Sequence, residues 1–186
     1  MKTDRLVDLP PRRRSLPAAA PCIDAGLIAR AGKLLKVLKL RKLTIVTAES
    51  CTAGLISAAL SQVEGAGEIL HGSFVTYTKA NKSAALGVSP ELLRTEGSVN
   101  AAVVKQLAGG ALLRSPADIA LAVTGVLGPD PDEDGNPVGL VYLCCCRRDG
   151  EPTVVREDYG KAAHDLLRRR VVIEALDLAE ACIAKS

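Results

Sequence analysis

The sequence is poor in aromatic side chains: its 186 residues include no tryptophan, one phenylalanine and three tyrosines. A hydrophobic core must therefore be built from leucine, valine, isoleucine and alanine. Proteins that bind single-stranded nucleic acids commonly stack aromatic rings on successive bases. With so few rings, the folded part of the chain is not expected to have a nucleic-acid partner.

Long apolar runs are also missing. No stretch reaches the ~18–20 apolar residues of a membrane-spanning helix, so we expect no membrane partner. Three arginines at 12–14 precede a short apolar segment, an order typical of twin-arginine export signals, but Pro17 and Pro21 interrupt that segment. The sequence therefore predicts a cytoplasmic protein.

The six cysteines show no CxxC spacing, and neither histidine has ligand spacing to a cysteine. A zinc site is therefore not expected, and we predict no metal and no other cofactor. Three consecutive cysteines, at 144–146, fall in an apolar run, where neighbouring side chains of a strand point to opposite faces. Small buried thiols in a reducing compartment account for this pattern.

The net charge of +3 is confined to the N-terminus. Residues 1–21 contain five basic and two acidic side chains, so residues 22–186 carry no net charge. We expect residues 1–21 to be a basic, disordered tail and residues 22–186 to form a single domain. Two questions stay open at this stage: whether the tail docks on nucleic acid, and whether the domain forms a homo-oligomer.

Hydrophobic periodicity predicts an α/β protein. Short continuous apolar runs, typical of buried strands, alternate with helical patterns. The expected helices cover residues 23–40, 51–63, 79–86, 90–95, 99–114 and 162–184, and the expected strands cover residues 43–48, 69–77, 118–124, 138–146 and 153–159. This alternation favours a three-layer α/β/α sandwich, and a hairpin of the last two strands would make its sheet mixed.

The segment TAESCTAG, residues 47–54, brings hydroxyl and thiol groups to the junction of a strand and a helix. N–H groups at the start of the helix expected over 51–63 suit an oxyanion or a phosphate. Ser50 would then be either a catalytic nucleophile or a residue of a simple helix cap, in which Ser50 or Thr52 is the N-cap. Cys51 is an alternative nucleophile, because a helix N-terminus lowers the pKa of a thiol.

A serine nucleophile needs a base, and the sequence contains no GxSxG, no SxxK and no recognisable triad histidine. The segment FVTYTKANK, residues 74–82, supplies Tyr77, Lys79 and Lys82. A lysine buried among apolar groups loses its proton more easily and can then act as base. The alternative is that these are rim and solvated side chains. The five-residue step from Tyr77 to Lys82, without a GxGxxG motif, disfavours a dehydrogenase.

The loop at residues 125–137 is rich in glycine, proline and acidic side chains. Three aspartates at alternate positions imitate the first half of an EF-hand calcium loop, but Val141 stands where a bidentate glutamate is required, so we reject calcium. Thr124 and Gly125 lie at the C-terminal end of the preceding strand, where open α/β sheets usually bind ligands.

Several segments together resemble the CinA C-terminal domain family, whose enzymatic members are nicotinamide-nucleotide amidohydrolases. The segments are TAESCTAG, FVTYTKANK, LGVSPELL, ALAVTGVLGP and NPVG, in this order, and the likeness runs from about Leu43 to Ala181. The resemblance implies hydrolysis of nicotinamide mononucleotide to nicotinate mononucleotide and ammonia, without a metal, as in pyridine nucleotide salvage. Many members carry a further N-terminal domain, and we expect none in this chain, where a short basic tail precedes the first helix.

The resemblance also implies roles for individual residues. It matches Ser50 to the family's serine, and Tyr77 and Lys82 to its tyrosine and lysine. We expect Ser50 to be the nucleophile, Lys82 its base, and Tyr77 to support the proton relay through its hydroxyl. Contacts with a small pyridine nucleotide substrate are expected from Glu49, Cys51, Thr52, Thr124 and Gly125.

The sequence departs from the family pattern at four places. Ala53 replaces the second glycine of CTGG, Lys79 replaces an asparagine, Asn100 replaces a serine, and acidic residues follow Pro129 in place of a glycine-rich loop. A methyl group at residue 53 blocks close backbone approach, and carboxylates disfavour a phosphate. The alternative function is therefore a nucleotide- or partner-binding domain of the same fold that has lost turnover.

Overall fold

The computed structural model describes residues 23–184, so the tail expected at residues 1–21 lies outside the described residues. The elements follow in the order α1 (Ala25–Arg41), β1 (Ile45–Glu49), α2 (Leu55–Ser61), the 3-10 helix η1 (Ala66–Glu68), β2 (Leu70–Val75), α3 (Lys79–Leu86), α4 (Pro90–Thr95), α5 (Ala101–Leu113), β3 (Ile119–Gly125), β4 (Leu140–Arg147), β5 (Thr153–Asp158) and α6 (His164–Ala184). Every helix and strand expected from the sequence pattern is present, with ends that differ by at most four residues.

The five strands form one mixed sheet in the order β2-β1-β3-β4-β5. Strand β1 pairs in parallel with both β2 and β3, whereas β4 pairs antiparallel with β3 and with β5. The expected hairpin of the last two strands is therefore confirmed. Because β1, β2 and β3 run in the same direction, their C-terminal ends meet at one edge of the sheet.

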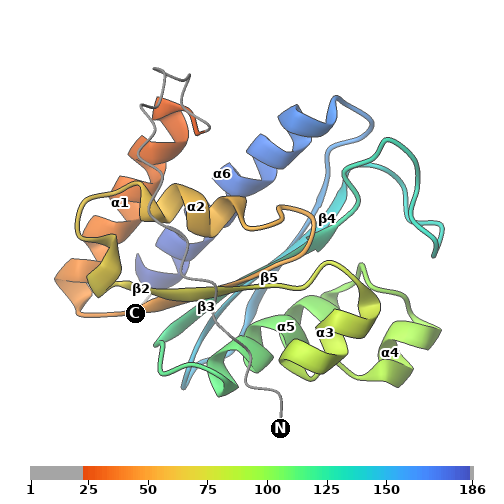
Figure 1. Ribbon diagram of the computed structural model, residues 1–186, viewed down its shortest axis with the longest axis horizontal. Coiled ribbons are helices and arrows are strands. Elements are labelled where there is room, and N and C mark those ends of the chain that lie inside the picture. The colour runs from red at the N-terminus through yellow and green to blue at the C-terminus, as the bar shows by residue number, and fades with distance from the viewer. Residues whose placement is uncertain (1–22, 185–186) are drawn as a thin grey trace, which may run out of the picture.

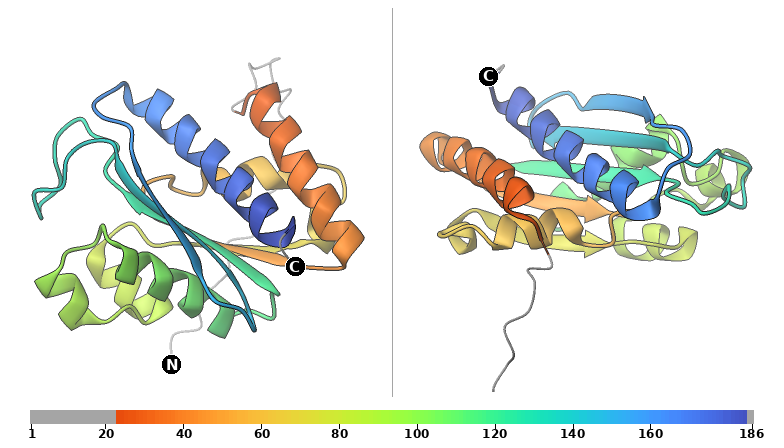
Figure 2. Two further views of the ribbon diagram at one scale, coloured as in Figure 1. Left: turned by 180° about the vertical axis from the view of Figure 1, so that it is seen from behind. Right: turned by 90° about the horizontal axis from the view of Figure 1, so that it is seen from above.

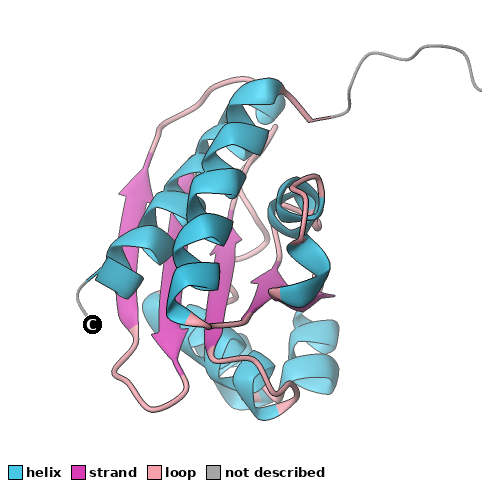
Figure 3. Cartoon of the chain, turned by 90° about the vertical axis from the view of Figure 1, so that its left-hand side faces the viewer, coloured by secondary structure: helices cyan, strands magenta, loops and turns pink. Residues whose placement is uncertain are grey.

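Helices cover both faces of this sheet (Figure 1). Helices α1, α2 and α6 lie on one face and α3, α4 and α5 on the other, and the views from behind and from above agree (Figure 2). Figure 3 shows two long helices packed in front of the strands. The three-layer α/β/α sandwich is confirmed. Within residues 23–184, no helix combines the length and the apolar character needed to cross a bilayer.

The core is aliphatic, as the shortage of aromatic residues requires, and the sheet divides it into two clusters. One contains Leu34 and Ile56 under α1, α2 and α6, and the other contains Val104 and Leu107 under α5. Burial of such side chains stabilises the fold by ~1.5–3 kcal/mol for each residue. The two clusters hold the helices of both layers against the central strands, which end at the candidate site.

Side-chain caps fix where two of the helices near this edge begin. The hydroxyl of Thr78 accepts a hydrogen bond from the N–H of Asn81 at 3.1 Å and so starts α3. Asn100 accepts from the N–H of Val103 at 2.8 Å and starts α5. Serine and asparagine are about equally good N-caps, so the departure from the family pattern at Asn100 leaves the helix start intact.

Helix α3 packs closely on α5 at Gly110. A Cβ added to Gly110 would collide with the carbonyl oxygen of Leu86, the last residue of α3. Gly109, the preceding residue, has open space at the same point. The contact between α3 and α5 therefore requires glycine at 110 and not at 109.

Candidate active site

Ser50 lies in a tight turn directly after β1. Its N–H donates to the carbonyl of Val123 in β3 at 3.2 Å, and its own carbonyl accepts from the N–H of Ala53 at 3.0 Å. Two left-handed residues follow, Ala53 with φ of 51° and Gly54 with φ of 93°. Left-handed backbone is costly for alanine and not for glycine. The turn is therefore kept at Ala53 although glycine would fit it better. The turn leaves Ser50 6% exposed, in the wall of a cavity.

The carboxylate of Glu49, rather than Ser50, caps helix α2. It accepts hydrogen bonds from the N–H of Ile56 at 3.0 Å and from the N–H of Ser57 at 2.9 Å. Helix α2 begins at Leu55, four residues later than expected, with Gly54 at its N-cap position. The interpretation of Ser50 as N-cap is therefore wrong. These N–H groups of α2 are bound to Glu49 and do not face a substrate.

Glu49 and Thr52 lie under the turn and not in the cavity wall. Both are fully buried, and the hydroxyl of Thr52 donates to Glu49 at 2.7 Å. The hydroxyl of Thr47 donates to the other oxygen of the same carboxylate at 3.1 Å. Buried carboxylates need such partners. The expectation that the side chains of Glu49 and Thr52 contact a substrate is corrected: their hydrogen bonds make these side chains supports of the turn, and of the two residues only the backbone N–H of Thr52 stays a candidate contact.

Lys82 reaches Ser50 from the other layer of the sandwich, because α3 and α2 lie on opposite faces of the sheet. Its ammonium donates to Ser50 Oγ at 2.8 Å, to the carbonyl of Thr76 at 2.9 Å and to the carbonyl of Tyr77 at 3.2 Å. The residue is 1% exposed. Burial lowers the pKa of Lys82 from 10.5 to about 8. A general base needs a pKa near the working pH, and Lys82 has one.

Tyr77 contacts Lys82 through its backbone and lines the cavity with its side chain. Its carbonyl accepts from Lys82, while its side chain lines the cavity and the residue is 66% exposed. Among residues 23–184, no hydrogen bond joins the Tyr77 hydroxyl to Ser50 or to Lys82. The structure brings Tyr77 into the site, and the role of its hydroxyl in a proton relay stays a prediction.

Cys51 also lines the cavity, but its thiol is not activated. Burial raises the pKa of Cys51 from 9.0 to about 12, although the neighbouring N–H groups and Lys82 act in the opposite direction. The expected lowering at a helix N-terminus is wrong, because α2 begins later and its N–H groups are bound to Glu49. The geometry therefore favours Ser50 over Cys51 as the nucleophile.

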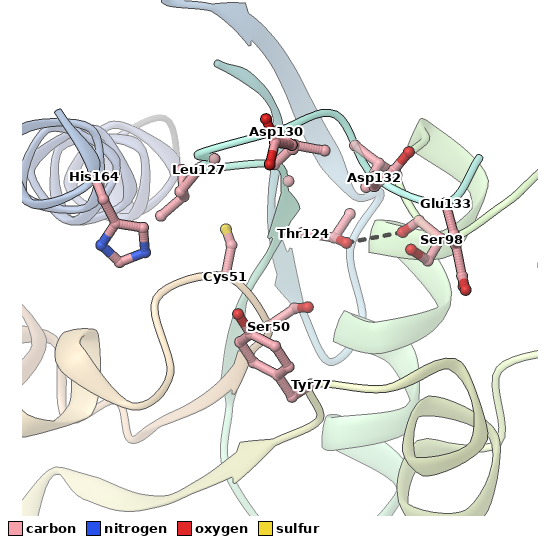
Figure 4. Close-up of a pocket in the computed structure, with 14 residues that line it drawn as sticks. Ser50, Cys51, Tyr77, Ser98, Thr124, Leu127, Asp130, Asp132, Glu133 and His164 are labelled. Atoms are coloured by element: carbon pink, nitrogen blue, oxygen red, sulfur yellow. Dashed lines mark hydrogen bonds between the residues drawn. The ribbon is translucent and has the colours of Figure 1, made fainter. Parts of the chain in front are cut away.

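The cavity beside Ser50 has a volume of about 340 Å³. Thr124 and Gly125 line it at the C-terminal end of β3, and the Thr124 hydroxyl donates to the carbonyl of Ser98 at 2.8 Å (Figure 4). A Cβ on Gly125 would lie 2.8 Å from the carbonyl oxygen of Leu140. Glycine at this position thus lets β4 approach the edge of the cavity. This is the C-terminal end of β3, where the sequence analysis expects a ligand.

Residues that the sequence did not assign to the site complete the cavity. Figure 4 shows further wall residues around Ser50, namely Ser98, Leu127, Asp130, Asp132, Glu133 and His164. Their positions depend on the paths of loops, which hydrophobic periodicity does not predict. The only available signal was the unusual acidic composition of the loop after Gly125, which did not say that this loop borders the cavity.

Lys79 holds the acidic loop in place. Its ammonium lies 2.6 Å from Asp134 and 3.0 Å from Glu133. Asp132 braces the same loop by accepting from the N–H groups of Asp134 at 3.0 Å and Asn136 at 2.8 Å. Lys79 and the acidic loop are two of the departures from the family pattern, and ion pairs join them.

The arrangement suits acyl transfer. A buried serine hydroxyl, an amine with a lowered pKa in contact with it, and an adjoining cavity are the parts that a covalent hydrolase needs. Within residues 23–184, no group of three His, Cys, Asp or Glu side chains is placed to hold a metal ion.

Comparison with protein-family models matches residues 28–183 to the CinA C-terminal domain. A putative competence-damage inducible protein of Acetivibrio thermocellus is 39% identical over 150 residues, which cover 81% of this chain and 36% of the relative. Nicotinamide-nucleotide amidohydrolase PncC of Escherichia coli is 33% identical over 153 residues, which cover 82% of this chain and 92% of that protein. The chain thus spans about a third of the length of its competence-damage inducible relatives.

Solved structures agree with these matches. The competence/damage inducible protein CihA from Agrobacterium tumefaciens superposes with a TM-score of 0.83 at 36% identity, covering 87% of this chain and 98% of that chain. A CinA superfamily protein from Klebsiella pneumoniae gives a TM-score of 0.82 at 28% identity, covering 86% and 99%. The shared fold therefore includes nearly all of both structures.

Proposed function

The chain belongs to the CinA C-terminal domain family, and from this premise we propose that it is a nicotinamide-nucleotide amidohydrolase. The proposed reaction converts nicotinamide mononucleotide and water to nicotinate mononucleotide and ammonia, as a step of pyridine nucleotide salvage. The relative that bears this name matches over most of its own length. The observation that carries the proposal is the 2.8 Å contact between Lys82 Nζ and Ser50 Oγ.

In the first half of the reaction, Ser50 Oγ attacks the carboxamide carbon while neutral Lys82 takes the hydroxyl proton. The N–H groups of Cys51 and Thr52, which follow the nucleophile and lie beside the cavity-lining thiol, are the proposed donors to the tetrahedral oxygen. The C–N bond then breaks as the Lys82 ammonium gives its proton to the amide nitrogen, which leaves as ammonia. An acyl ester on Ser50 remains.

In the second half, neutral Lys82 takes a proton from water as the water oxygen attacks the ester carbon. The ester C–O bond breaks, Ser50 regains its proton from Lys82, and the product leaves as a carboxylic acid, which passes its proton to the released ammonia in solution. One amide and one water give one carboxylate and one ammonium. The carbonyls of Thr76 and Tyr77 keep the amine at Ser50 between these transfers, since both accept hydrogen bonds from Nζ.

The proposal is tested by ammonia release from nicotinamide mononucleotide with purified wild type, Ser50→Ala and Ser61→Ala. Ser61 is a matched control, because its hydroxyl donates to a carbonyl within α2 and lies away from the cavity. We expect Ser50→Ala to fall to background with an unchanged circular dichroism spectrum, and Ser61→Ala to keep its rate. Full ammonia release by Ser50→Ala would refute the serine mechanism.

The acidic cavity wall is the observation that favours a second function, ligand binding without turnover. Calorimetry on the wild type separates the two functions. Binding of nicotinamide mononucleotide together with background ammonia release would identify a binding domain, whereas turnover that depends on Ser50 identifies the enzyme.

A further inference from the structure

We propose that the acidic loop widens the substrate range of this site to nicotinamide riboside, the pyridinium nucleoside without a phosphate. The chain hydrolyses this amide at least as efficiently as nicotinamide mononucleotide. The inference rests on the proposed amidohydrolase function and extends it in two ways. It names a substrate class, cationic N-glycosylated pyridine carboxamides, and it names Asp130 and Glu133 as residues that select within that class.

Three carboxylates border the space that a substrate must occupy. Asp130, Asp132 and Glu133 line the same cavity as Ser50, and Figure 4 shows them across it from Ser50 and Tyr77. Because the carboxamide carbon must reach Ser50 Oγ, the sugar and any phosphate extend away from Ser50. They enter the part of the cavity that the acidic loop borders.

The nearest cation does not neutralise this loop. Lys79 lies between Asp134 and Glu133 at 2.6 and 3.0 Å, and the hydrogen bond with Asp134 raises its pKa. With Asp130 and Asp132, the loop holds four carboxylates against this one ammonium, a net formal charge of −3.

Other positive groups near the cavity are few. Of the described residues that line it, none is a lysine or an arginine, and the basic side chain is His164, which lies 3.6 Å from Asp165. Lys82 contacts Ser50, where the carboxamide of the substrate must lie, and with a pKa of about 8 it loses its charge above about pH 8. The N–H of Ser98, a cavity-lining group that could hold a phosphate oxygen, already donates to Asp134 at 3.1 Å.

The two pyridinium amides differ in one group. Both carry a positive charge on the ring nitrogen, and the mononucleotide adds a phosphate with a charge of about −1.5 to −2 at neutral pH. Carboxylates in the wall attract the ring and repel the phosphate. Binding of the nucleoside is favoured by the attraction of its ring to the carboxylates, whereas binding of the mononucleotide is also opposed by the repulsion of its phosphate. Free nicotinamide, which is neutral, gains neither.

The experiment compares kcat/KM for ammonia release from nicotinamide riboside, nicotinamide mononucleotide and free nicotinamide at pH 8.5 and low salt. The enzymes are wild type, Asp130→Asn, Glu133→Gln and the matched control Glu151→Gln. Glu151 is exposed beyond the C-terminal end of β4, at the opposite end of the sheet from the cavity. Calorimetry on Ser50→Ala gives the affinities for the same three compounds without turnover.

The expected ratio of kcat/KM, riboside over mononucleotide, is one or more in the wild type. It falls about threefold in each of Asp130→Asn and Glu133→Gln, because unit charges near a surface interact modestly. Raising the salt to about 0.5 M shrinks the effect, since screening acts within ~10 Å or less. Glu151→Gln leaves the ratio unchanged.

A preference for the mononucleotide of about tenfold or more that neither Asp130→Asn nor Glu133→Gln alters would overturn the inference and leave the proposed function standing. Absence of ammonia release from all three amides would instead overturn the proposed function. In that case the binding ratio of riboside to mononucleotide decides whether the acidic loop selects against phosphate.

Discussion

Replacing Lys82 by methionine tests two roles of its amine separately: the loss of stability from burying its charge, and its proposed action as a base. Lys82 is 1% exposed, and this burial lowers its pKa from 10.5 to about 8. Methionine has a similar length and no charge. We expect Lys82→Met to release no ammonia above background and to differ from the wild type in how its stability depends on pH.

The sign and size of that difference follow from proton linkage. Below about pH 8 the lysine is charged in both the folded and the unfolded chain, and the folded state bears the full cost of burying the charge. Between pH 8 and 10.5 the folded protein has lost this proton and the unfolded chain still holds it, so the free energy of unfolding rises with pH. A shift of this size corresponds to roughly 3 kcal/mol. The stability of Lys82→Met minus that of the wild type should therefore fall by roughly 3 kcal/mol from pH 7 to pH 10.5.

The comparison must be a difference between the two proteins, because other groups titrate in the same range. Burial raises the pKa of Cys51 and Cys144 to about 12, which makes stability fall as pH rises. The contribution of Cys144 is the same in both proteins and cancels in the difference, and that of Cys51 cancels in large part, because burial and not Lys82 is the main cause of its raised pKa. Urea unfolding followed by far-ultraviolet circular dichroism is the assay, since the chain has no tryptophan. Parallel stability profiles for the two proteins would refute the reasoning.

The same pKa predicts the pH profile of the wild-type rate. At pH 7 a lysine with a pKa of about 8 is neutral in about 9% of molecules, some 300-fold more than an unshifted lysine. We expect kcat/KM to rise with pH and to level off above about pH 8. A rate that stays flat or falls between pH 6.5 and pH 9 would contradict a role for Lys82 as base.

Three further substitutions test the turn around the nucleophile. Ala53→Gly should raise the free energy of unfolding by ~1 kcal/mol, because φ of 51° is costly for alanine; a loss of stability in urea would count against this. Glu49→Gln should lower it by ~2 kcal/mol, since Ile56 and Ser57 donate to different carboxylate oxygens and the amide NH2 that replaces one of these oxygens cannot accept; an unchanged urea midpoint would be the contrary result. Cys51→Ser should keep most ammonia release, because with a pKa of about 12 few molecules carry a thiolate; loss of turnover with the fold intact would restore the thiol as nucleophile.

The sequence predicted the layers and strand types well, because apolar periodicity reports burial directly. Helices α3 and α4 were placed at the right residues, since Thr78 and Ser89 are local caps that the sequence displays. Helix α2 was started too early because its cap comes from Glu49, a residue at the end of the preceding strand. Propensity rules search for caps next to the helix and do not find one at this distance.

The pairing of Ser50 with Lys82 could not be derived from periodicity, since the two residues are 32 apart in the chain, one in the turn after β1 and the other in α3. The family resemblance supplied it. Sequence reasoning assigned Glu49 and Thr52 to the substrate because they neighbour Ser50, but the tight turn after β1 places both side chains beneath it, where they hydrogen-bond to each other. The acidic loop was recognised by composition, and only its path after β3 brings Asp130 to the cavity.

The close fit of Gly110 against Leu86 connects a residue outside the cavity wall to the helix that carries Lys82. Leu86 ends the same two-turn helix that carries Lys82, and the ammonium of Lys82 must stay within hydrogen-bonding distance of Ser50. A methyl group at 110 would force the backbones of α3 and α5 apart, whereas one at 109 meets open space. We therefore expect a side chain at 110 to weaken the contact between Lys82 and Ser50 without changing any residue of the cavity wall, an effect that inspection of the substrate contacts alone would overlook.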